Sequence, residues 1–383
     1  MTTTMTTGVR MGASVATNAR EAVAELAREL VQPDMRLVVF HCSPRYDRDE
    51  LTSALKECFH GVPVIGCTTA GEITPIGYRD GSLTGVSLAG EDFAAETVLI
   101  DSLKEFEVSR GRQAGLAVRN ALQKRGLVVG GKTTFGFMLI DGLSVREEGV
   151  VGSLYQSLGD IEMVGGSAGD ETNFGTTWVY HDGRFHTDAA VFALIHTTRP
   201  FRVFQTQHFD FAEGRMVVTE AITEQRIVTE INGYPAGREY AKVVGLEVKE
   251  LTPMIFAAHP VVVRINGKPF VRSIQKVNPD ESLTFFCGID EGMVLTVAKG
   301  VDMTARLRAA FQQVEGEIGR PDLVLGCDCI LRYLEMQQKN LTQEISELLN
   351  DYNVVGFSTY GEQYNGMHVN QTFTGVAIAR RSG

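Results

Sequence analysis

The stretch VPVIGCTTAGEI, residues 62–73, joins an apolar run to a bend that holds two glycines, small polar residues and a carboxylate. Two later stretches nearly repeat it, IEMVGGSAGDE from residue 161 and NVVGFSTYGEQ from residue 353. Aligned on these bends, the first glycines are Gly66, Gly165 and Gly356, and the second glycines, each directly before an acid, are Gly71, Gly169 and Gly361. Glycine supplies positive φ angles or close approach of the backbone, so the stretch is first of all a structural corner.

Each bend closes a longer repeat of strand, amphipathic helix and strand. The first strands of the repeats are RLVVFHCS from residue 36, TFGFMLIDG from residue 134 and DLVLGCDC from residue 322. Two strands joined through a helix run parallel, with a right-handed crossover. The sequence therefore predicts α/β units in which each first glycine ends a parallel strand.

The pattern changes after Arg199–Pro200. Alternating stretches such as RMVVTEAI and RIVTEING predict antiparallel meanders, and the Asn-Gly pair between PVVVRI and FVRSIQKV predicts a hairpin. A helix over PAGREYAKVVG separates two sets of such strands. The fold class is thus mixed α/β and α+β, with a flexible leader (1–20), a first domain (21–199) and a second domain (200–383).

Composition narrows the classes of partner. The formal net charge of −11 argues against binding to nucleic acid or to an anionic membrane surface, which leaves a small molecule or a protein as partner. The six scattered cysteines favour reduced thiols and a cytoplasmic location. We find no phosphate loop, zinc-protease helix or dinucleotide fingerprint, and no apolar run that would span a bilayer.

Three groups of residues carry a resemblance to a known family. They are GCTTAGEI with VGGSAGDE and VYHDGRFHTDAAVFALI, then VVTEAITEQRIVTEINGYPAGREYAKVVG, and the closing NVVGFSTYGEQYNGMHVNQTFTGVAI. With these, the chain resembles the FIST family, a two-part bacterial sensory module. The resemblance implies ligand sensing in signal transduction without a general enzymatic activity.

Within that family, TQHF, EINGYPAGREYA and VRSIQKV look most like the NosP branch of haem-containing nitric-oxide-sensing proteins. This resemblance implies haem as cofactor, nitric oxide as signal, and a histidine kinase or a cyclic-di-GMP enzyme as partner. From the sequence, a homodimer also stays open. Many FIST proteins carry a Gly-Cys pair near the start of the second half, whereas this chain has TQHFDF there.

Histidine is a common axial ligand of haem that binds a diatomic gas. His208, flanked by phenylalanines in an alternating strand, is the predicted ligand, with His368 and His259 as alternatives. Arg202, Arg264 and Arg215 are predicted to pair with the propionates. A histidine or surface arginine is more often structural.

Two other functions stay open from the residues alone. A small polar ligand such as an amino acid would be held by the amides and hydroxyls of the bends, with Glu72 or Glu362 receiving its ammonium group. The structural alternative is that these hydroxyls cap their own turns. A hydrolase would use Cys67, but Gly166 and Phe357 occupy the matching positions, so the shared bend does not require a thiol. We predict a sensor and not an enzyme.

Overall fold

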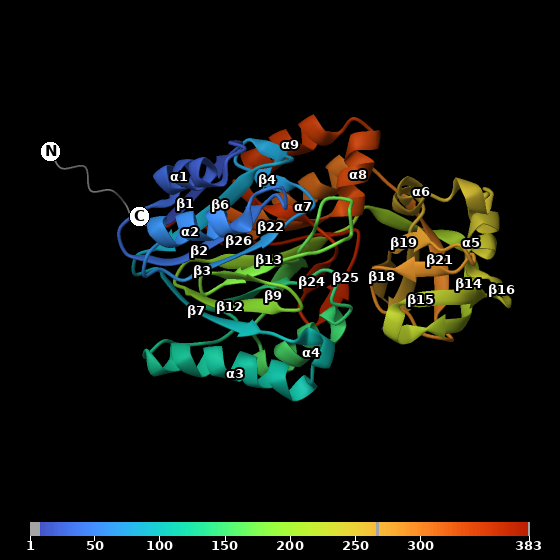
Figure 1. Cartoon of the computed structure of the whole chain (residues 1–383), viewed down its shortest axis with the longest axis horizontal. Helices are drawn as coiled ribbons and strands as arrows, with labels where there is room; N and C mark the ends of the chain where they lie inside the picture. The colour runs from blue at the N-terminus through green and yellow to red at the C-terminus, as the bar shows by residue number, and fades with distance from the viewer. Residues whose placement is uncertain (1–7, 266–267, 382–383) are drawn as a thin grey trace.

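The computed structural model describes residues 8–265 and 268–381 of the chain. A larger body holds three similar units, and a smaller lobe projects from one end of it (Figure 1). The predicted mixed class is confirmed, because the body combines parallel strand pairs with helices while the lobe is antiparallel. Within the described part of the chain, no helix is long and apolar enough to cross a bilayer.

Unit one contains the first predicted repeat and a strand and helix before it. Asn18 and Asp47 cap the two helices with their side chains, which satisfies amide groups that a helix start leaves open. Its elements are β1 (Val9–Ser14), α1 (Ala19–Leu30), β2 (Met35–Cys42), α2 (Arg48–Cys58), β3 (Val64–Thr68), β4 (Glu72–Thr74), β5 (Gly77–Arg79) and β6 (Leu83–Ala89).

Unit two follows the same order, so the second repeat also lies between an added strand and a returning strand. Its elements are β7 (Phe93–Ile100), the short η1 (Leu103–Glu105), α3 (Val108–Lys124), β8 (Thr134–Ile140), α4 (Glu147–Leu158), β9 (Met163–Ser167), β10 (Val179–His181), β11 (Arg184–His186) and β12 (Ala190–Thr197).

Unit three is interrupted by the lobe after its first strand. Its elements are β13 (Phe201–Thr206), α7 (Met303–Ile318), β22 (Pro321–Cys329), α8 (Ile330–Gln338), α9 (Thr342–Asp351), β23 (Val354–Thr359), β24 (Glu362–Tyr364), β25 (Met367–Val369) and β26 (Phe373–Ala379). The predicted boundary at Arg199–Pro200 falls between β12 and β13, inside the body, and stays a prediction about sequence halves.

The three units exchange hairpins in a closed ring. Hairpin β10–β11 of unit two pairs with β3 of unit one, β24–β25 of unit three with β9 of unit two, and β4–β5 of unit one with β23 of unit three. Each exchange covers the edge that a parallel pair would leave open. The three six-stranded sheets share one core, to which every unit contributes buried residues.

The first glycines of the bends play a different role from the predicted one. Gly66, Gly165 and Gly356 lie inside β3, β9 and β23 and do not end them. They stand directly beside Phe40, Met138 and Gly326 of the parallel neighbours, and an added Cβ would clash with those residues. The predicted parallel pairs are thus confirmed, but these glycines allow close approach and do not make the turn.

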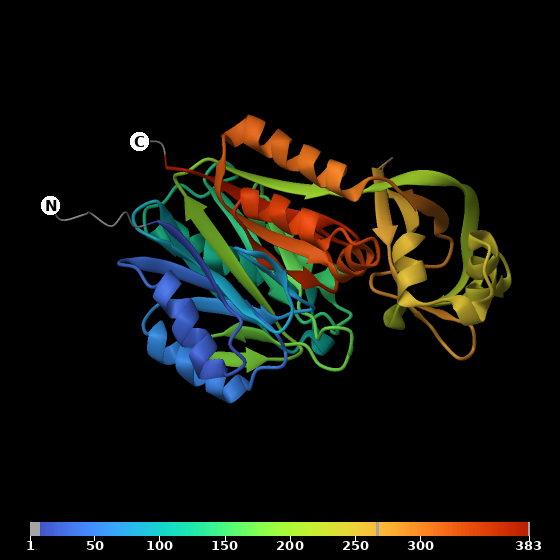
Figure 2. The same ribbon diagram turned by 90° about the horizontal axis from the view of Figure 1, so that it is seen from above.

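The lobe spans residues 209–300, and its described residues fold as one eight-stranded antiparallel sheet with two helices. Figure 2 shows it beyond one end of the body. Its elements are β14 (Phe209–Ile222), η2 (Thr223–Gln225), β15 (Ile227–Ile231), β16 (Tyr234–Pro235), α5 (Ala236–Val244), η3 (Val248–Glu250), α6 (Pro253–Ala258), β17 (Val261–Ile265), β18 (Lys268–Arg272), β19 (Ile274–Val277), β20 (Leu283–Phe285) and β21 (Val294–Gly300).

The predicted meanders and helix of this region are confirmed. β17 and β18 pair as an antiparallel hairpin, although its Asn-Gly turn lies outside the described residues. The predicted helix is α5, which ends at Gly245 with φ 77°. The predicted leader is wrong from residue 9 onward, because β1 pairs with β6 along its whole length; residues 1–7 lie outside the described residues.

Candidate functional site: a cavity beside the three bends

The three bends meet at one end of the body and are hydrogen-bonded to one another. The amide of Gly169 donates to Thr68 O (2.9 Å), that of Ser358 to Gly71 O (2.7 Å), and that of Ser167 to Gly361 O (2.8 Å). Segments about 100 and 200 residues apart in sequence therefore form one polar ring of backbone.

Bends one and three hold their glutamates inside the protein in the same way. The hydroxyl of Thr69 donates to one carboxylate oxygen of Glu72, and Ser82 donates to the other through its amide (2.9 Å) and its hydroxyl (2.7 Å). In bend three, Thr359 and Thr372 bind Glu362 in the same pattern. We call each arrangement a glutamate clamp.

Both clamp carboxyls are almost completely excluded from water. Burial raises the pKa of Glu72 to about 7 and that of Glu362 to about 8, although the hydrogen bonds from Thr69, Ser82, Thr359 and Thr372 favour the ionised forms. The prediction that one of these glutamates receives a ligand ammonium group is not supported by this geometry. Their neighbouring hydroxyls cap their own bends instead.

Bend two is one residue shorter and has no glutamate clamp. Asp170 faces outward and accepts hydrogen bonds from the amides of Gly175 and Thr176 (both 3.1 Å), so it orders the loop that follows. Glu171 takes a left-handed conformation (φ 49°), which turns the chain away from the ring. The departure from the repeat exposes a short polar segment beside the ring.

A cavity of about 170 Å³ opens at this segment. Its lining comes from bends one and two, from the loop after β2, from the end of the β4–β5 hairpin and from α8. The lining residues are Arg45, Ala70, Asp80, Glu171, Thr172, Ile330, Tyr333, Leu334 and Gln337. It lies at the carboxyl ends of parallel strands, where open α/β sheets commonly bind ligands.

The cavity presents charges of both signs. Arg45 Nε lies 2.6 Å from Glu171 Oε1, and the hydroxyl of Tyr333 donates to Asp80 (3.1 Å). Burial raises the pKa of Tyr333, as does the neighbouring Asp80, so its hydroxyl keeps its proton. Gly71 leaves room for two of these side chains, because at its φ of 138° an added Cβ would lie 3.2 Å from Asp80 and 3.3 Å from Tyr333.

The predicted haem ligand His208 lies elsewhere, in the connection between β13 and β14, and is fully buried. Arg332 Nη1 lies 2.7 Å from its Nδ1, and Glu335 Oε2 lies 2.8 Å from its Nε2. A guanidinium only donates, so Nδ1 accepts and Nε2 carries the proton. Burial lowers the pKa of His208 to about 4, and the Arg332 charge adds to this, which keeps the ring neutral.

The other predicted haem residues have separate partners. His368, on β25, is buried between Gln363 (3.3 Å) and the carbonyl of Phe286 (3.4 Å). His259 ends α6, and its carbonyl accepts from Tyr240 (2.7 Å). Arg202 pairs with Glu317 (2.8 Å), while Arg264 and Arg215 lie on exposed strand positions of the lobe. These residues do not face a common apolar slot.

Cys67 lies in the shared core with its sulfur 3.7 Å from His41 Nδ1. Burial raises the pKa of the thiol and lowers that of His41 to about 3. A cysteine nucleophile needs a thiolate and access to substrate, and both residues are almost entirely excluded from water. Cys327 and Cys329 are buried, free thiols in β22.

Most of the residues that line the cavity were not predicted from the sequence. Arg45, Asp80 and Tyr333 belong to unremarkable polar loops and a helix, and only the fold brings them together. The sequence did mark the charged network around His208, because Asp328, Arg332 and Glu335 are charged residues at helical spacing within the apolar run CDCILRYLEM. Charges inside such a run have to be paired.

Comparison with known families gives two adjoining matches. The FIST N domain matches residues 36–234, and the FIST C domain matches residues 236–365. The first match alone covers more than half of the chain, and it includes bends one and two. The second covers most of the lobe, α8 and bend three.

Two individual proteins were also compared. The uncharacterized protein MJ1623 of Methanocaldococcus jannaschii is 22% identical over 373 residues, which cover 86% of this chain and 71% of that protein. The crystal structure of cyanuric acid hydrolase from A. caulinodans overlaps 97% of this chain and 99% of its own, with a TM-score of 0.43 and 8% identity. An overlap at that level establishes neither a common fold nor a common activity.

Proposed function

This chain belongs to the FIST family of sensory, ligand-binding modules, and we propose that it senses a small zwitterionic metabolite of the amino-acid class. The ligand lies in the cavity lined by Arg45, Asp80, Glu171 and Tyr333. The protein acts as a binding module and not as an enzyme.

The observation that supports this proposal is the placement of opposite charges around a small space. Arg45 offers a guanidinium to a carboxylate, and Asp80 and Glu171 offer carboxylates to an ammonium group. The volume of about 170 Å³ is below the roughly 300–1,000 Å³ typical of drug-sized ligands. The ion pair between Arg45 and Glu171 is exposed enough to exchange for a ligand, with side-chain exposures of 64% and 27%.

Thermal unfolding with each standard amino acid tests the proposal. A ligand present at one hundred times its Kd stabilises the folded chain by about 2.7 kcal/mol, which raises the Tm measurably. Arg45→Met should abolish the shift, because the carboxylate loses its partner. Arg79→Met is the matched control, since Arg79 is a nearby exposed arginine outside this cavity. A panel without any shift would contradict the proposal.

We propose that a partner signalling protein, either a histidine kinase or a cyclic-di-GMP enzyme, receives the signal from this sensor. This part rests on the family and on the acidic surface implied by a net charge of −11. Co-purification with the histidine kinases and cyclic-di-GMP enzymes of the source cell, with and without the stabilising amino acid, would identify the partner.

Haem-based nitric oxide sensing is the alternative proposal, and the sequence resemblance is its support. The residues as placed do not fit haem, because both ring nitrogens of His208 are already hydrogen-bonded and its ring is fully buried. Binding of iron at His208 would break its hydrogen bond to the buried side chain of Arg332 or Glu335, which costs stability inside a protein. A visible absorption spectrum after addition of haem distinguishes the two proposals. A stoichiometric Soret band that His208→Ala abolishes would overturn the metabolite proposal.

A further inference from the structure

The polypeptide chain passes between body and lobe in two short crossings, residues 207–208 and 301–302. The crossings lie side by side, because the amide of Val301 donates to the carbonyl of His208 (2.8 Å) and β14 pairs with β21 from Phe209 and Gly300 onward. Two adjacent crossings form a single narrow connection, about which a rigid lobe can turn.

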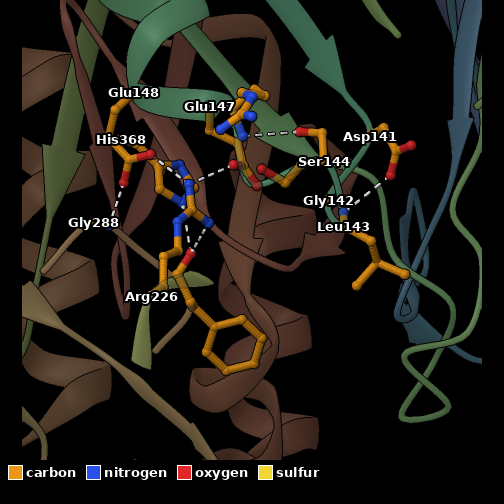
Figure 3. A network of polar contacts seen from close by, with 12 residues as sticks. Asp141, Gly142, Leu143, Ser144, Glu147, Glu148, Arg226, Gly288 and His368 are labelled. Carbon is orange, nitrogen blue, oxygen red and sulfur yellow. Dashed lines mark hydrogen bonds and ion pairs between the residues drawn. The ribbon is translucent and has the colours of Figure 1, made fainter. Parts of the chain in front are cut away.

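A second contact holds the lobe against α4 of the body (Figure 3). Arg226 of the lobe, in a left-handed conformation (φ 56°), pairs with Glu147 (2.6 Å) and with Glu148. Glu148 also accepts from the amide of Gly288 (2.5 Å). We call these four residues the latch.

Arg226 and Glu148 of the latch are charged at neutral pH. Burial on its own raises the pKa of Glu148, but the positive side chains around it and the Gly288 amide outweigh burial and lower the pKa to about 2. The opposing charges attract strongly because the site is largely shielded from water. Removal of one partner would leave a buried charge without compensation.

The interface between lobe and body combines apolar packing with polar groups that are incompletely satisfied. Phe286 of the lobe is buried in one hydrophobic cluster with Leu331 and Tyr360 of the body. Arg272 Nη1 and the amide of Ser273, both in the lobe, reach His368 O and Asn370 Oδ1 of the body only at 3.4 Å. Arg272 Nε, Ser273 Oγ and Asn370 Nδ2 are buried and have no hydrogen-bond partner among the described residues. Water would satisfy these polar groups if the lobe moved away, which lowers the cost of separating them, whereas exposure of the apolar cluster around Phe286 opposes the movement.

A continuous set of contacts links the cavity to the connection through α8. Tyr333, in the cavity wall, stacks on Tyr78 with ring centroids 4.7 Å apart. The hydroxyl of Tyr78 donates to Asp328, Asp328 pairs with Arg332 (2.5 Å), and Arg332 donates to His208 (2.7 Å). A shift of α8 on ligand binding would therefore reach the residue at the lobe connection.

We infer that the lobe is a hinged output element of the sensor. It pivots at His208, the latch of Arg226 on α4 holds it closed, and ligand in the cavity biases its position through α8 and Arg332. The hinge and the latch follow from the contacts above, whereas the bias by ligand rests on the proposed function. The partner protein then recognises the lobe in one of its two positions.

Distance measurements between spin labels test the hinge without any ligand. Leu116→Cys on α3 and Val243→Cys on α5 offer exposed sites on body and lobe, in a Cys58→Ser background that removes the one native cysteine not buried. The latched protein should give one narrow distance distribution. Arg226→Met should add a second, longer population, while Arg238→Met, which removes an exposed lobe arginine paired with Glu281, should change nothing.

Glu148→Gln is the milder second variant, because the Glu148 side chain is 37% exposed and Glu147 still pairs with Arg226. It should give the longer population to a smaller extent than Arg226→Met. Distributions of Arg226→Met and Glu148→Gln that superimpose on the parent would overturn the hinge. Circular dichroism melts establish that the variants compared are folded.

The coupling to the cavity is tested with whichever standard amino acid raises the Tm. That amino acid should change the ratio of the two populations in the parent but not in His208→Leu, which removes the acceptor for Arg332. An equal change in His208→Leu would overturn the route through α8. If no amino acid raises the Tm, the proposed ligand and its coupling to the lobe are both contradicted. The comparison of Arg226→Met with the parent still tests the hinge.

Discussion

Bends one and three differ from bend two in what they do with their acidic residue. Glu72 and Glu362 are buried in matching glutamate clamps, whereas Asp170 faces the surface and caps a loop. The cavity borders bend two, at Glu171 and Thr172. Bends one and three stabilise the ring of bends, whereas bend two, which departs from the repeated sequence, borders the candidate ligand site. Such departures from a sequence pattern are expected at functional sites.

The largest expected effect comes from the second glycines of the regular bends. Gly361→Val should destabilise the fold by about 4 kcal/mol, from strain at its φ of 148° and from a clash with the His368 ring. Gly71→Val should cost less, about 1–3 kcal/mol, because its nearest neighbours are 3.2 Å or more from an added Cβ. Urea unfolding measures the free energy of unfolding of both mutants, and parental stability in both would contradict the predicted strain at these glycines.

The glutamate clamps predict a pH dependence that bend two does not share. Between about pH 4.5 and 7 the folded chain keeps Glu72 protonated while the unfolded chain ionises it, so stability falls as pH rises, by about 3 kcal/mol over the interval. For Glu362 the fall continues to about pH 8. Glu72→Gln and Glu362→Gln should each flatten the curve of unfolding free energy against pH, and unchanged curves would contradict the buried clamps.

Asp170→Asn should have a smaller effect, about 1 kcal/mol, because the amide oxygen of asparagine still accepts from the backbone of Gly175 and Thr176. Stability by urea unfolding is the measurement, with Glu72→Gln alongside. A loss for Asp170→Asn larger than that caused by either glutamate variant would show that bend two is also a structural clamp.

Cys67→Ser should have the smallest effect, about 1 kcal/mol or less, since a hydroxyl can donate to His41 Nδ1 where the thiol lies. Gly166 and Phe357 occupy the matching positions of the other bends, so no shared function is lost. Amino-acid binding should stay as in the parent. A burst of product from an activated ester that requires Cys67 would instead assign a hydrolase.

The amino-acid sequence by itself determined the three repeats, their parallel strand pairs, the antiparallel region between them and the family. These features have a short range: periodic apolar residues, helix caps such as Asn18, and glycines such as Gly71 act within a few residues of themselves. The role of Gly66 was predicted only in part, because a clash with Phe40 depends on a neighbouring strand.

The tertiary structure alone decided the exchange of hairpins, the insertion of the lobe in unit three, and the partners of the candidate ligand residues. His208 lies 124 residues before Arg332, and Tyr78 lies 250 residues before Asp328. Whether a histidine or a carboxylate is a ligand, a clamp or a hinge residue depends on which charges surround it and how much water is excluded. Both are set by packing between distant segments, which no local pattern of the sequence records.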